Sequence, residues 1–203
     1  MLPALQQLTL REPAAGPDGV PRLAEKLGAG ALPAVTWLSL NLTRVGDAGA
    51  SALAAALGRG AMPRLAHLWL DSTGIGDAGL VVLAPALQRL PALEDLDLAG
   101  NPFGDLGLAA LVAPLPPAGA PPPPPAGGPK QLKVLNLGST QIADAGCDAL
   151  VAALDDGALP ALGRLYHGAT LRASAAARAA VMEALARATS REPPRPPDLL
   201  RHL

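Results

Sequence analysis

His67 and Asp95 are the only residues whose types and placement resemble an acid–base pair. General acid–base catalysis also needs a reacting group, such as a nucleophile or oxyanion donors, and we identify neither nearby. The sequence contains no Gly-rich phosphate loop ending in Lys-Ser/Thr and no paired-Cys or His-Glu-x-x-His metal spacing. It also lacks a Gly-x-Ser-x-Gly nucleophile elbow. We therefore expect no enzyme, no bound metal and no cofactor.

The composition excludes several classes of partner. The chain has 203 residues, a net charge of −1 and a single cysteine. There is no basic field for nucleic acid, no polybasic membrane patch and no apolar run long enough to span a membrane. One cysteine forms no internal disulfide, and the N-terminus does not resemble a signal peptide. The sequence therefore predicts a cytoplasmic protein that binds neither nucleic acid nor membrane.

The chain repeats itself, and this pattern determines the expected fold. The shared pattern is L-x-x-L-x-L, a turn with Thr or Asn, and then Asp-x-Gly. Strong copies are VTWLSLNLTRVGDAG, LAHLWLDSTGIGDAG, LEDLDLAGNPFGDLG and LKVLNLGSTQIADAG; weaker ones are LQQLTLREPAAGPDG and LGRLYHGATLRASAA. The six copies start 30, 30, 28, 39 and 30 residues apart, from Leu5 to Leu162. Leucine alternation in L-x-x-L-x-L indicates a short strand with one buried face.

These copies resemble the repeats of leucine-rich repeat proteins, in particular the ribonuclease-inhibitor-like subclass. They are also similar to the repeats of Ran GTPase-activating proteins and NOD-like receptors. The resemblance implies an α/β fold: a right-handed solenoid of about six strand–helix repeats in an arc, with a parallel sheet on its concave face. We expect this domain to cover residues 1–189. A disordered Pro-rich loop at about 114–130 would interrupt it, and a disordered Pro/Arg-rich tail would follow at 190–203.

Three positions of the repeat, an aspartate, a glycine and a turn residue, have structural explanations. The aspartates are predicted to cap the helices that they open, and the glycines two residues later to permit close packing. The turn residues are predicted to satisfy backbone groups inside the bend. The aspartates are Asp47, Asp77, Asp105 and Asp144; the glycines are Gly49, Gly79, Gly107 and Gly146; the turn residues are Thr43, Thr73, Asn101, Thr140 and Thr170.

The strand residues between the leucines should face away from the core, and three of the four aromatic side chains lie there. In-register strands would place Trp37 beside His67, and Trp69 between Ser39 and Asp97. Aromatic side chains rimmed by carboxylates are typical of an interface hot spot. The predicted partner-binding residues are Trp37, His67, Trp69, Asp71, Asp95, Asp97, Arg164 and Tyr166. The alternative is that the indoles lie over aliphatic stems and bind nothing.

The remaining functional alternatives concern the whole chain. We expect a protein–protein interaction scaffold; the alternatives are a GTPase-activating protein of the Ran-activator type, the sensor segment of a larger protein, and a spacer. The Pro-rich segments would offer polyproline II ligands to SH3, WW or profilin-like partners. His167 occupies a leucine position and Cys147 a core position, so both are interpreted as structural. The helix predicted within residues 171–190 would cap the stack.

Overall fold

The architecture comes from a computed structural model, which describes residues 5–10, 19, 22, 24, 31–113, 130–168 and 172–190. From β2 onward, strands and helices alternate along the described chain. The strands are β1 (Gln7–Thr9), β2 (Trp37–Ser39), β3 (His67–Trp69), β4 (Asp95–Asp97), β5 (Val134–Asn136) and β6 (Arg164–Tyr166). The helices are α2 (Gly46–Gly58), α3 (Asp77–Gln88), α4 (Asp105–Val112), α5 (Asp144–Asp155) and α6 (Ala175–Ser190).

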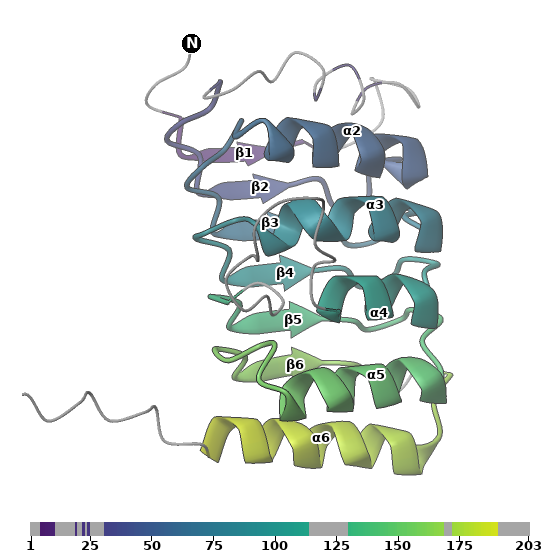
Figure 1. The fold of residues 1–203 in the computed structure, drawn as a ribbon. Helices are drawn as coiled ribbons and strands as arrows, with labels where there is room; N and C mark the ends of the chain where they lie inside the picture. The colour runs from purple at the N-terminus through teal and green to yellow at the C-terminus, as the bar shows by residue number, and fades with distance from the viewer. Residues whose placement is uncertain are drawn as a thin grey trace, which may run out of the picture.

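The described strands form one parallel sheet in chain order, from β1 to β6. Helices α2 to α6 stack beside it as a second layer (Figure 1). Each strand pairs with the next in the same register, so equivalent residues of successive repeats are direct neighbours: Trp37 pairs with His67, and His67 with Asp95. The repeat and register predictions are thus confirmed, and the alternating strand–helix units make a solenoid.

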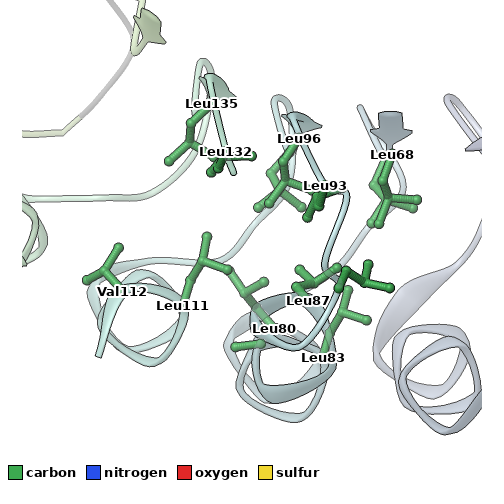
Figure 2. Packing of buried hydrophobic residues seen from close by; sticks show 14 of the residues in the cluster. Leu68, Leu80, Leu83, Leu87, Leu93, Leu96, Leu111, Val112, Leu132 and Leu135 are labelled. Atoms are coloured by element: carbon green, nitrogen blue, oxygen red, sulfur yellow. The ribbon is translucent and has the colours of Figure 1, made fainter. Parts of the chain in front are cut away.

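The core lies between the sheet and the helices. The central leucines of strands β2 to β6 are buried, and Leu68, Leu70 and Leu96 have no exposed surface. Figure 2 shows leucines of the strands and helices pointing toward one another between the layers. The leucines of the helices that face the sheet are buried, and Phe103 is fully buried. Neither layer could bury its apolar face alone, so each repeat depends on its neighbours.

The predicted role of the repeated aspartates was wrong in one respect: each carboxylate binds the next helix, not its own. None of helices α2 to α5 has a side-chain hydrogen bond at its own N-cap. Asp77 Oδ1 instead accepts the Gly104 and Gly107 N–H groups, at 2.9 and 2.7 Å, at the start of α4. The same contact recurs along the stack, from Asp47 to Gly76 N (2.7 Å), Asp105 to Ala143 N (2.7 Å) and Asp144 to Ser174 N (2.6 Å).

This displacement has a geometric cause. Successive helices pack side by side, so the N-terminal amides of one helix lie next to the first turn of the preceding helix. The free N–H groups of a helix N-terminus donate hydrogen bonds to any nearby carboxylate, whichever repeat supplies it. The aspartates therefore link neighbouring repeats, and the stack gains one polar bridge per junction.

The repeated glycine makes room for this bridge. A Cβ on Gly79 would lie 2.5 Å from Asp47 Oδ1 and 2.9 Å from Asp47 Cα. At Gly146 it would lie 2.5 Å from Asp105 Oδ1. The predicted close packing is confirmed at these positions. The group that approaches each glycine is the aspartate of the preceding repeat.

The turn residues satisfy backbone groups as predicted. Thr43, Thr73 and Thr140 donate their hydroxyls to the carbonyls three residues earlier, at 2.6, 2.8 and 2.8 Å. Asn101 does more, because its amide also reaches the preceding repeat. Its Nδ2 donates to Leu70 O (2.7 Å) and Leu98 O (2.9 Å), while its Oδ1 accepts Ile75 N (2.9 Å).

Several expectations fall on residues that the structure does not describe. Thr170, residues 114–129 of the Pro-rich loop and residues 191–203 of the tail lie outside the described ranges. The domain limits and the Pro-rich docking segments therefore stay predictions. Helix α6 is described and packs against α5, as expected of the last helix of the stack, with Arg187 Nη2 2.9 Å from Asp155 Oδ2.

Candidate functional site

The candidate site lies on the sheet face turned away from the helices. Strand alternation places the first and third residues of each three-residue strand on this face and the central leucine in the core. The two tryptophans come from neighbouring strands. Trp69 lies between Ser39 and Asp97 in the paired strands, as predicted. We call the cluster Trp37, His67, Trp69, Asp71, Asp95 and Asp97 the aromatic–acidic patch.

The two indoles contact each other. The Trp37 and Trp69 ring centroids are 4.2 Å apart with an interplanar angle of 64°, an edge-to-face arrangement. Trp37 also lies against His67, with centroids 4.8 Å apart. Both indoles are half-buried. The rings therefore support one another and keep part of their surface open to solvent.

Asp95 orients this aromatic cluster. Its Oδ2 accepts the Trp69 Nε1–H at 3.2 Å and lies 3.5 Å from His67 Nδ1. The His67 contact has the distance of an ion pair but not the alignment of a hydrogen bond, because Nδ1 has no hydrogen-bond partner in the described structure. His67 and Asp95 therefore meet as expected, but the main effect of Asp95 is to hold the Trp69 ring in place.

Asp97 is the carboxylate whose ionisation the patch disfavours most clearly. Burial raises its pKa, and the negative charges of Asp71 and Asp95 add to this effect. Hydrogen bonds from the Ala99 N–H, at 3.0 Å, and from Asn136 act in the opposite direction. The patch thus holds a partly buried carboxylate in a negative field, which a cation would stabilise.

Arg164 and Tyr166 lie apart from this patch. They belong to β6, which is separated from β4 by β5. Two strand spacings amount to about 10 Å. Both side chains are exposed, Tyr166 by 54%. The structure therefore groups six of the eight predicted residues and leaves Arg164 and Tyr166 as a second exposed area on the same face.

Two features of this region were missed. Ser39, expected to face outward, is only 6% exposed, and its paired neighbour is the large Trp69 ring. Leu42 follows β2 in a left-handed conformation (φ 60°) and is 69% exposed. The sequence alone could have shown that Leu42 is unusual, because the equivalent positions hold Ser72, Gly100 and Ser139, which suit a turn better than leucine does.

No group of three or more His, Cys, Asp or Glu in the described ranges is arranged to hold a metal ion. No helix of the described parts is long and apolar enough to cross a membrane. Cys147 is buried, and burial raises the pKa of its thiol, which opposes reactivity. Cys147 and His167 line a small cavity with leucines of the last three repeats, including Leu108 of α4.

The family follows from sequence and structure together. A family model described as leucine-rich repeat matches residues 35–54, 90–112 and 130–151, which fall in the second, fourth and fifth repeats. Together with the stacked strand–helix units, these matches identify the chain as a leucine-rich repeat protein. The ribonuclease-inhibitor-like subclass stays a prediction.

Two solved structures are similar to this chain. One is leiomodin-1 actin-binding site 2; it is 15% identical, has a TM-score of 0.60, and the match covers 88% of this chain and 91% of that one. The other is an internalin from Listeria monocytogenes, 15% identical with a TM-score of 0.44, covering 89% of this chain and 46% of that one. The likeness to the leiomodin-1 structure concerns the fold alone. No curated protein matches the chain.

Proposed function

We propose that the protein is a non-catalytic scaffold of the cytoplasm that binds a partner protein on its open sheet face. The observation that carries this proposal is the pair of half-buried, mutually packed indoles of Trp37 and Trp69. The flanking polar residues of the proposed site are His67, Asp71, Asp95 and Asp97, with Arg164 and Tyr166 extending it toward β6. Leucine-rich repeat solenoids commonly bind proteins through such extended surfaces.

The physical support is energetic. A tryptophan buries more apolar surface on binding than any other side chain, and interface hot spots are enriched in it. These indoles are already ordered by each other and by the Asp95 carboxylate. Binding would therefore cost little side-chain entropy of the two tryptophans, and such preorganisation favours affinity.

The test compares two double variants with the wild-type full chain. Trp37→Ala/Trp69→Ala removes the indoles. Val81→Ala/Val82→Ala is the matched control, because both valines are exposed, by 37% and 49%, on α3. Circular dichroism first checks that both variants fold. Affinity capture from lysate then supplies partners, and purified actin is tested beside them because the leiomodin-1 structure is that of an actin-binding site.

The expected result is a selective loss. Binding of a captured partner, measured by calorimetry, weakens by at least about tenfold in the tryptophan variant and is unchanged in the valine variant. Equal affinity of wild type and the tryptophan variant for every captured partner would refute the proposal.

A further inference from the structure

The aromatic–acidic patch and Leu42 together indicate what kind of segment binds there. We propose that the partner presents an extended segment that places an arginine over the Trp37–Trp69 pair and an aliphatic side chain against Leu42. This inference rests on the proposed function and specifies its ligand. It is carried by three observations: uncompensated negative charge, open aromatic surface and an exposed leucine in a strained backbone.

The negative charge of the patch is not paired with a lysine or arginine of the described residues. Asp71 accepts a hydrogen bond from the neutral Ser72 hydroxyl at 3.2 Å. Asp97 accepts the Ala99 N–H and a hydrogen bond from Asn136. Lys133, which lies next to the patch, pairs with Glu94, and Arg187 pairs with Asp155, so neither cation pairs with a patch carboxylate. A complementary partner must therefore bring the positive charge.

An arginine fits this surface better than a lysine. Its planar guanidinium stacks on an indole face and also donates paired hydrogen bonds to a carboxylate. The patch offers both groups side by side, because Trp69 and Asp97 are direct neighbours in the paired strands β3 and β4. A lysine ammonium would satisfy the charge but not the planar geometry.

Leu42 supplies the apolar contact. At the equivalent turn position the other described repeats have φ values of 54° (Ser72), 66° (Gly100) and 57° (Ser139), in the region that favours glycine. A leucine there costs conformational energy, and its side chain, 69% exposed, contributes little to the core. Folding therefore gives no reason for leucine at this position, whereas an apolar contact with a partner does.

Leu42 adjoins the patch. The Leu42 N–H donates to Asp71 O at 2.9 Å, and Asn41 Oδ1 accepts the Asp71 N–H at 3.0 Å. Asp71 is also close enough to Asp97 for its charge to add to the effect of burial, which raises the pKa of Asp97. The backbones of Leu42 and Asp71 are therefore direct neighbours. A single extended segment bound along the strand ends can reach both the patch and Leu42.

The experiment uses a phage-displayed library of short random peptides, selected on the full chain. Selected peptides are synthesised, and their affinities are measured by fluorescence anisotropy. We expect the selected sequences to share an arginine followed within a few residues by Leu, Ile or Val. Replacing this arginine with citrulline, its neutral isostere, should weaken binding by at least about tenfold.

Variants of the protein supply the second readout. Leu42→Gly should weaken peptide binding by about tenfold while leaving the melting temperature equal or higher, because glycine relieves the backbone strain. If Leu42 had only a structural role, Leu42→Gly would leave peptide binding unchanged and would lower the melting temperature. Ser139→Gly is the matched control at the equivalent turn of a distant repeat, and its binding should equal wild type. Asp97→Asn should weaken binding while the Ala99 N–H keeps its hydrogen-bond acceptor.

The outcomes separate this inference from the proposed function. Peptides that lose binding with Trp37→Ala/Trp69→Ala, but bind equally with citrulline or with Leu42→Gly, overturn the inference and leave the proposed function standing. Peptides that bind the Trp37→Ala/Trp69→Ala variant as tightly as the wild type contradict both the inference and the proposed function. A library that returns no peptide for this face overturns the extended-segment inference alone. Competition by a synthetic peptide of residues 191–203, which contains three arginines, would assign the face to this chain's own tail and also overturn the inference.

Discussion

The contact between Gly79 and the preceding repeat supports a quantitative prediction. A Cβ at this position would lie 2.5 Å from Asp47 Oδ1 and, more seriously, 2.9 Å from Asp47 Cα. The carboxylate can rotate, but the Cα belongs to the backbone of α2 and moves only if the two helices separate. Gly79→Ala should therefore disturb the packing between α2 and α3.

The magnitude follows from two opposing effects. Overpacking of a close contact costs about 1–3 kcal/mol. Alanine in place of glycine inside a helix returns about 0.5–1 kcal/mol. The net loss in the free energy of unfolding is then about 0–2.5 kcal/mol, which for a chain of this size lowers the melting temperature by up to roughly 10 °C.

The assay is urea denaturation followed by circular dichroism, with Gly58→Ala as the matched control. Gly58 is the last residue of α2, and a Cβ there would meet nothing within 4 Å. Gly58→Ala should be neutral or slightly stabilising. The double variant Asp47→Ala/Gly79→Ala should recover only part of the loss, because Asp47 Cα remains. A Gly79→Ala variant as stable as Gly58→Ala would show that the packing argument is wrong.

Two further predictions concern the polar groups. Asn101→Ala should lower the free energy of unfolding by about 3–5 kcal/mol, because it leaves several buried backbone groups of two repeats unpaired. Asn101→Thr should lower it less, since a threonine at this turn position still satisfies the carbonyl three residues earlier. Equal losses for the two variants in urea titrations would contradict this explanation. Asp97→Asn should stabilise the protein more at neutral pH than at acid pH. The folded-state pKa of Asp97 is raised above the ordinary value of 3.8, so wild-type stability is fullest below that value and falls as the pH rises through the folded-state pKa. The asparagine variant avoids this fall, and a stability difference from wild type that shrinks between pH 3 and pH 7 would count against it.

The repeat, the buried leucines and the common register of the strands could all be predicted from the amino-acid sequence. These features depend on local periodicity, since alternation fixes which side chains face the helices and a constant repeat length aligns equivalent residues. The same logic placed Trp37, His67, Trp69 and Asp95 on one face, where the structure has them.

Which neighbour each polar or aromatic group contacts became clear only from the three-dimensional arrangement of the repeats. Asp77 binds the next helix rather than its own, and Trp37 packs diagonally on Trp69 in addition to its paired neighbour His67. Asn101 joins two turns, and burial, with a smaller contribution from the charges of Asp71 and Asp95, raises the pKa of Asp97. These contacts depend on the lateral offset between stacked repeats. That offset is set by how side chains of adjacent repeats pack, and a one-dimensional pattern does not contain it.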